Sequence, residues 1–174
     1  EHNTGLPFHI DADFFPTNDR KRIIFGDDFQ AEWNRAAIRA AINAFTGDLT
    51  ALARKFGAVR FWSTMEQLKK VADMSPQNQG ESVFSEFWRY ALPKLKIGDV
   101  LIDTKGAWCS PEEVHVLLQS QESTSIEILE SIGARILHES LRPYQALIRN
   151  SGVALFDLET LCERLQSSGL DKRT

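Results

Sequence analysis

The chain has 174 residues, of which 43% are hydrophobic and 25% are charged, a composition typical of globular proteins with a packed core. It contains no apolar run near the roughly 20 residues that span a bilayer, and no signal peptide, so we expect no insertion in a membrane. Residues 1–75 contain ten Lys and Arg and ten Asp and Glu, and residues 76–174 contain ten Lys and Arg and fourteen Asp and Glu. Neither half is basic, which argues against nucleic-acid binding, because that affinity depends on the number of phosphates neutralised.

The cysteines and the first residues indicate the setting of the protein. Cys109 and Cys162 are the two cysteines of the sequence. They lie far apart and outside any paired motif, which favours buried thiols in a reducing compartment over a disulfide. We therefore expect a cytoplasmic protein, with the nucleus as the alternative. Residues 1–5 run directly into a predicted strand, and we expect the sequence to be part of a longer polypeptide.

Residues 6–14 predict a β-strand with one buried face. Apolar side chains alternate with other residues through this stretch, which is the period of two expected for a strand. The apolar members are Leu6, Phe8, Ile10, Ala12 and Phe14. Pro16 and the polar residues after it are expected to end the strand.

A long helix is predicted from about residue 29 to residue 45. Asp27 or Asp28 can cap its first turn, because a carboxylate accepts hydrogen bonds from the unpaired backbone N–H groups there. We expect this helix to lie on a small sheet through an aromatic and small-residue stripe at helical spacing. The members of the stripe are Phe29, Trp33, Ala36, Ala37, Ala40, Ala41 and Ala44.

Three adjacent cations, Arg20, Lys21 and Arg22, lie between the predicted strand and the predicted helix. In that position a rigid scaffold can aim them at an anion. The alternative is a solvated turn in which these side chains pair with neighbouring aspartates. We call residues 17–22 the basic turn.

Capped helices are predicted after the long one. Asp48 can cap a helix that Gly57 ends, and the next apolar stripe, residues 61–72, is expected in the core. The spacing of apolar residues from 84 to 92 predicts an amphipathic helix that ends before Pro93.

A domain boundary is predicted near the middle of the chain. Residues 73–80 are polar and contain Pro and Gly, as linkers often do. We therefore expect one domain in residues 1–75 and a second in residues 76–174.

The second half predicts one hairpin and several helices. Residues 100–108 read as a small hairpin. Ser110 and Glu113 form a capping box with Pro at the first helical position, so we expect a helix to follow through residue 118. Further helices are expected after Thr124, Ser140 and Asp157, where capping residues precede apolar residues at helical spacing.

No self-contained active site is predicted. His9, Asp11 and Asp13 share one strand face, but they are too few to hold zinc or a hard cation, so we expect no metal there. Cys109 is expected to be a buried thiol rather than a nucleophile. The sequence contains neither of the two Gly-rich phosphate-binding motifs, G-x-x-x-x-G-K-S/T and G-x-G-x-x-G.

Several segments of the sequence resemble a known family. Residues 6–10 read Leu-Pro-Phe-His-Ile, residues 14–23 read Phe-Phe-Pro-Thr-Asn-Asp-Arg-Lys-Arg-Ile, and residues 30–37 read Gln-Ala-Glu-Trp-Asn-Arg-Ala-Ala. These segments resemble the region after the ATP-binding domain of sacsin-like proteins, which resemble the ninety-kilodalton heat-shock chaperones of the GHKL ATPase superfamily. Residues 92–165 resemble later parts of sacsin-like repeats through Gly106-Ala-Trp-Cys-Ser-Pro-Glu-Glu, Leu129-Glu-Ser-Ile-Gly and Leu141-Arg-Pro.

The resemblance implies a role for the basic turn. In the chaperones, a middle-domain loop of the form Asn-x-Ser-Arg sends its Arg to the γ-phosphate of ATP held by the preceding domain. Asn18-Asp19-Arg20 occupies the matching place here, with Asp19 where the chaperones have Ser. The resemblance nominates Arg20 as the catalytic residue and Asn18, Lys21 and Arg22 as further nucleotide-binding residues. ATP and its Mg would be held mainly by an upstream domain.

The sequence therefore predicts an α+β fold. A short strand, the basic turn and a long helix would lie on a small sheet, followed by a mostly helical array with one hairpin. We expect a fragment of a chaperone-like ATPase without activity of its own, whose partners are an upstream ATP-binding domain and client proteins. The alternative is a non-enzymatic protein-protein interaction module in which the basic turn is surface.

Overall fold

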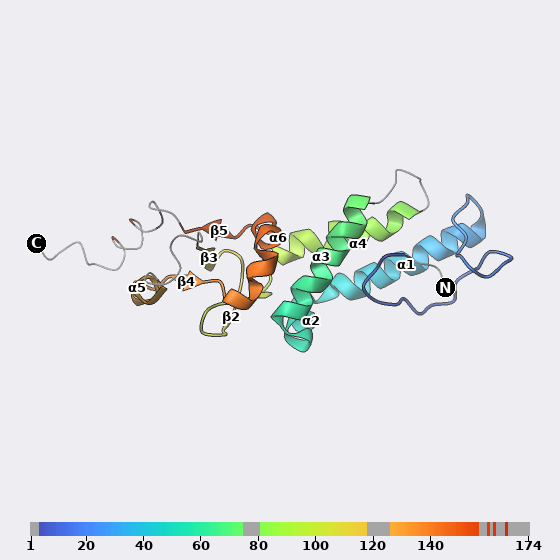
Figure 1. The fold of residues 1–174 in the computed structure, drawn as a ribbon. Coiled ribbons are helices and arrows are strands. Elements are labelled where there is room, and N and C mark those ends of the chain that lie inside the picture. Colours follow the sequence, from blue (N-terminus) through green and yellow to red (C-terminus); the bar gives the residue numbers. More distant parts are fainter. Residues whose placement is uncertain are drawn as a thin grey trace, which may run out of the picture. The chain divides into compact units, whose positions relative to one another are not determined.

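The computed structural model describes residues 4–74, 81–117 and 126–156, together with Thr160, Cys162 and Gln166. In chain order the elements are α1 (Phe29–Gly47), α2 (Leu49–Phe56), α3 (Ala58–Met74), η1 (Glu81–Ser85), α4 (Glu86–Leu95), β1 (Leu101–Ile102), β2 (Trp108–Cys109), β3 (Val114–Val116), α5 (Ile126–Ser131), β4 (Arg135–Ile136), η3 (Glu139–Tyr144), α6 (Gln145–Asn150) and β5 (Ala154–Leu155) (Figure 1). Helices dominate and the strands are short, so the predicted α+β class is confirmed.

The chain forms two compact units. The N-terminal unit contains Glu1–Phe56 and Arg60–Lys94, and the C-terminal unit contains Gly57–Val59 and Leu95–Thr174. The division after Lys94 differs from the boundary predicted at residues 73–80, of which 75–80 lie outside the described residues.

Aromatic packing explains why residues 81–94 belong to the N-terminal unit. The ring of Phe84 lies 5.8 Å from that of Phe25, and the ring of Phe87 lies 5.2 Å from Phe8 and 5.8 Å from Phe45. A polar, Pro-containing segment predicts a break in secondary structure, but these long-range ring contacts decide which unit the next helix joins.

The predicted helix caps of the first half are confirmed. Asp28 Oδ1 accepts a hydrogen bond from the Ala31 N–H at 2.8 Å, and Asp48 Oδ1 accepts one from the Ala51 N–H at 2.8 Å. Gly57, with φ of +80°, follows the end of α2. A left-handed residue after a helix is usually Gly, because other side chains are strained there.

The buried face of α1 differs from the predicted one. The buried residues are Ala31, Asn34, Ile38, Ile42 and Thr46, whereas Phe29 and Trp33 are 68% and 48% exposed. The Ile side chains remove more apolar surface from water than the alanines of the predicted stripe, so the helix is rotated to bury them. No sheet underlies α1 among the described residues of the N-terminal unit.

The predicted strand at residues 6–14 is also absent. The described part of this segment is irregular, and one isolated antiparallel bridge, Pro16 to Ile23, follows it. The apolar alternation still has a packing role, because the ring of Phe8 stacks on that of Phe45 at 4.9 Å. A period of two is not sufficient for a strand without a neighbouring backbone to pair with.

α3 and α4 supply large core side chains. The expected core stripe of α3 is confirmed for Phe61, Trp62, Met65 and Leu68, which are each at most 1% exposed, whereas Ala72 is half-buried. The predicted end of α4 before Pro93 is wrong, because Pro93 lies inside the helix, which continues to Leu95. Proline removes one backbone donor, a loss that the last turn of this helix tolerates.

The C-terminal unit contains the predicted hairpin. β1 pairs antiparallel with β2, with Leu101 opposite Cys109 and Ile102 opposite Trp108. Cys109 is fully buried, as predicted, but the expectation of a buried thiol is wrong for Cys162, which is exposed; both cysteines are free.

A parallel three-stranded sheet, not predicted from the sequence, completes this unit. Its strand order is β4-β3-β5, with β3 parallel to both neighbours. The expected helix after Ser110 is wrong: Glu113 Oε2 accepts a hydrogen bond from the Ser110 N–H at 2.9 Å, but a turn and then β3 follow. All three residues of β3 are buried, as expected for the central strand of a parallel sheet.

The other helix predictions have mixed outcomes. α5 is present and is followed by Gly133 with φ of +80°, and the predicted helix after Ser140 is present as η3 and α6. The cap of η3 is His138 rather than Ser140, because the Ser140 N–H donates to His138 Nδ1. The cap predicted at Thr124 and most of the helix predicted after Asp157 lie outside the described residues.

Candidate functional site

The basic turn is a hairpin loop closed by backbone hydrogen bonds. Pro16 and Ile23 form an antiparallel bridge, the Thr17 N–H donates to the Arg22 carbonyl at 2.8 Å, and the Arg20 N–H donates to the Thr17 carbonyl at 2.8 Å. The side chains of Asn18, Arg20, Lys21 and Arg22 are all exposed. The structure therefore brings the predicted site residues together on one loop that faces solvent.

Arg20 has an unusual backbone conformation. Its φ is +56°, and it is the one residue other than Gly with a positive φ in the described part of the chain. The left-handed region costs an L-residue roughly 1–2 kcal/mol. Such strain is often found at functional sites, where it is maintained by the surrounding structure.

The hydrogen bonds of Asp19 explain how this turn is maintained. Its Oδ1 accepts hydrogen bonds from Thr17 Oγ1 at 2.5 Å and from the Lys21 N–H at 3.1 Å. The Thr17 hydroxyl first, and then the Lys21 N–H, hold the pKa of Asp19 below its ordinary value. The carboxylate stabilises the turn from within.

The three cations form no ion pair with the described residues. The alternative in which Arg20, Lys21 or Arg22 pairs with a neighbouring aspartate is therefore not seen in the described part of the chain. The turn presents three positive charges to solvent, and its own carboxylate, Asp19, is directed at Thr17 and the Lys21 N–H, with a smaller electrostatic contribution from Arg22.

A buried side chain of α1, Asn34, anchors the basic turn. Asn34 Oδ1 accepts a hydrogen bond from the Phe15 N–H at 2.8 Å, and its Nδ2 donates to the carbonyls of Phe15 at 2.9 Å and Ile24 at 3.0 Å. Asn34 is fully buried. One amide thus holds both ends of the loop against the helix.

The anchoring role of Asn34 was not predicted, although the spacing of residues in the sequence indicates that its side chain is buried. Asn34, Ile38 and Ile42 recur every four residues on one helix face. An amide in an apolar stripe must find hydrogen-bond partners once buried. The side chains on either side of Asn34 also hold the loop, since Trp33 Nε1 donates to the Asp13 carbonyl and Arg35 Nη1 to the Gly26 carbonyl.

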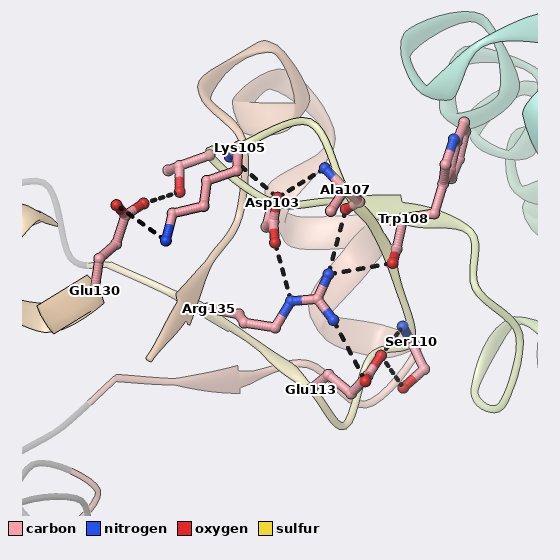
Figure 2. A network of polar contacts seen from close by, with 9 residues as sticks. Asp103, Lys105, Ala107, Trp108, Ser110, Glu113, Glu130 and Arg135 are labelled. Carbon is pink, nitrogen blue, oxygen red and sulfur yellow. Dashed lines mark hydrogen bonds and ion pairs between the residues drawn. The ribbon is translucent and has the colours of Figure 1, made fainter. Parts of the chain in front are cut away.

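The C-terminal unit contains a second polar cluster, centred on Arg135 (Figure 2). Arg135 Nε donates to Asp103 Oδ2 at 2.9 Å, its Nη2 donates to the Trp108 carbonyl at 3.2 Å, and its Nη1 lies 3.3 Å from Glu113 Oε1. Asp103 Oδ1 accepts from the N–H groups of Lys105 and Ala107. Arg135 therefore joins β4 to the hairpin and to the turn before β3.

The pKa values of this cluster indicate a structural role. Burial alone would raise the pKa of Asp103, but the Ala107 N–H and then the Arg135 guanidinium hold it below its ordinary value. Burial raises the pKa of the Cys109 thiol to about 12. Because the thiolate is the reactive form of cysteine, a fully buried thiol with a raised pKa is a poor nucleophile, as expected for Cys109.

We expect acid to destabilise the C-terminal unit through Asp103. The pKa of Asp103 is lower in the folded state than in the unfolded state. The carboxylate therefore stabilises the fold at pH values above its unfolded-state pKa. This stability is lost as the pH falls through the folded-state pKa. Amide hydrogen exchange at residues 101–109, corrected for the intrinsic rate, should lose protection below about pH 4. Asp103→Asn should weaken this dependence, and an equally steep loss in the variant would contradict the assignment.

The described residues show neither a metal centre nor a membrane span. No group of three or more His, Cys, Asp and Glu in that part of the chain could hold a metal ion. None of the helices described is long and apolar enough to cross a membrane.

Comparisons with known protein families, with curated proteins and with solved structures gave no match.

Proposed function

We propose that this chain is the region after the ATP-binding domain of a larger chaperone-like ATPase, and that Arg20 senses the phosphates of the bound nucleotide. The observation that carries the proposal is the conformation of Arg20. It is exposed on a braced loop, has a φ of +56°, and pairs with no carboxylate of the described residues. The sequence resemblance supplies the identity of the anion.

The chemistry of Arg suits this role. The guanidinium stays charged and offers a planar fork of donors that matches phosphate oxygens. One such donor aimed at developing charge contributes roughly 2–4 kcal/mol to a transition state. Asn18, Lys21 and Arg22 would add contacts to the same phosphates, while the upstream domain would hold ATP and Mg. The chain alone would have no activity.

Steady-state ATP turnover by the full-length protein tests this proposal. We expect Arg20→Ala to reduce turnover by roughly ten- to a thousandfold while ATP binding is kept, because a contact made mainly in the transition state is removed. Lys21→Ala and Arg22→Ala are matched controls on the same loop and should have smaller effects. Arg20→Lys should restore little activity, since Lys lacks the fork.

Two outcomes would contradict the proposal. Unchanged turnover in all three alanine variants would leave the basic turn as surface. A larger loss in Lys21→Ala or Arg22→Ala than in Arg20→Ala would transfer the role to that cation. Binding of ATP, measured separately, distinguishes a lost catalytic contact from a lost nucleotide site.

A second candidate function is a protein-protein interaction module. Phe29 and Trp33, one helical turn apart on α1, are 68% and 48% exposed, and both rings contact Phe15 just before the basic turn. Exposed aromatic residues and Arg are enriched at interfaces. If Phe29→Ala and Trp33→Ala abolish a partner contact while turnover stays unchanged in all Arg20 variants, this function is favoured.

A further inference from the structure

The N-terminal unit contains a pocket that the proposed function does not use. Its volume is about 450 Å³, within the range of about 300–1,000 Å³ of small-molecule sites. One wall is the segment from Pro7 to Asp11, and the others come from α1, the end of α2 and the first half of α3. All of these residues belong to one compact unit.

Most of the pocket wall is apolar. The side chains that form it are Phe8, Ile10, Ala41, Ala44, Phe45 and Phe56. The rings of Phe8 and Phe45 stack at 4.9 Å, which fixes one side, and Phe56 remains 40% exposed on another. Such a wall favours a ligand with an apolar chain or ring, because burial of that chain or ring against the wall removes apolar surface from water.

The pocket has one cation at its rim, Arg60. Its guanidinium carbon lies 5.9 Å from the centre of the Phe56 ring, a cation-π distance that orients the side chain. Arg60 forms no ion pair with a carboxylate of the described residues. Thr64, one turn later on α3, also borders the pocket.

The remaining charged group limits the charge of a ligand. Asp11 borders the pocket from the Pro7–Asp11 segment, and His9 is the other titratable residue of that segment. One Arg with a carboxylate nearby suits a single negative charge and disfavours a dianion such as a phosphate monoester. A carboxylate also matches the fork of donors on Arg60.

We propose that this pocket binds a small amphipathic monocarboxylate. The apolar chain lies between the Phe8–Phe45 pair and the alanines of α1, and the carboxylate accepts hydrogen bonds from Arg60. Octanoate is a suitable probe, and 1-octanol has the same chain without the charge.

An NMR titration of the isolated chain tests the proposal. We expect octanoate to give saturable shifts in the amide signals of residues 41–45 and 60–64, and 1-octanol to bind at least about tenfold more weakly. Arg60→Gln removes the charged hydrogen-bond donor of the carboxylate, so it should weaken octanoate about tenfold or more and leave 1-octanol unchanged. Asp11→Asn should strengthen octanoate, because it removes a like charge.

A blocking variant tests the location independently of charge. Ala44→Phe fills the pocket from an exposed position on α1 and should abolish the shifts for both probes, with the rest of the spectrum retained. Absence of saturable shifts in the wild type overturns the proposal. Equal affinity for the two probes, or an Arg60→Gln variant that binds octanoate as well as the wild type, also overturns it. None of these outcomes depends on the role of Arg20.

Discussion

Replacing Asp103 by Asn is expected to lower the free energy of unfolding of the C-terminal unit by about 2–3 kcal/mol. The side chain of Asp103 is 7% exposed and accepts from three donors, those of Lys105, Ala107 and Arg135. Asn keeps one acceptor oxygen but turns an N–H₂ group toward Arg135. The charge-assisted hydrogen bond is then lost, and two donor groups face each other. The 31% exposure of the Arg135 side chain lets it regain some water, which keeps the loss below that of a fully buried pair.

Native-state hydrogen exchange measures this loss within the unit. Peptides from residues 101–109 and 135–137 should lose protection together, because Arg135 joins the hairpin to β4. Lys105→Gln is the matched control, since the Lys105 to Glu130 pair is 3.7 Å long and Lys105 is 68% exposed. It should change stability by less than about 0.5 kcal/mol. Equal effects of the two substitutions would contradict a central role for Asp103.

Replacing Asn34 by Leu is expected to destabilise the N-terminal unit by about 2–4 kcal/mol. Leu has a similar shape but removes the hydrogen bonds of Asn34 to the Phe15 N–H and to the Phe15 and Ile24 carbonyls, of which the Phe15 carbonyl keeps a bond from the Ile24 N–H. A buried polar group left without a hydrogen bond costs roughly 1–3 kcal/mol, and water can satisfy part of this set. The basic turn should lose order first, because Asn34 holds both of its ends.

Amide exchange at Thr17 and Arg22, compared with exchange within α1, separates local loosening from global unfolding. Asn43→Ala is the matched control, because Asn43 is an exposed amide on the same helix. It should leave both the turn and the helix unchanged. If Asn34→Leu retained full protection at Thr17 and full stability, Asn34 would not be the anchor of the turn.

The helix caps of the first half, the turn glycines and the hairpin could be predicted because they depend on residues close together in the sequence. The side chains of Asp28 and Asp48 reach backbone N–H groups three residues later. Gly57 and Gly133 follow helices because they tolerate a positive φ. These features require no knowledge of what the helix packs against.

Most of the predictions that were wrong depended on a partner distant in the sequence. The capping box of Ser110 and Glu113 forms, yet a strand follows it, because Val114–Val116 pairs with two strands more than 15 residues away in the sequence. The alternation in residues 6–14 has no paired backbone among the described residues and stays irregular.

The features of the candidate site divide in the same way, into those that depend on neighbouring residues and those that depend on distant ones. The sequence by itself determined that three cations adjoin a capped helix. The expectation of no nucleic-acid site and the resemblance of Asn18-Asp19-Arg20 to a chaperone loop also rest on the sequence alone. Only the tertiary structure decided that Asn34 anchors their loop, that Arg20 adopts a positive φ, and that no described carboxylate pairs with it. The reason is physical: charge and capping are properties of neighbouring residues, whereas the buried face of α1 depends on which side chains of distant segments pack against it.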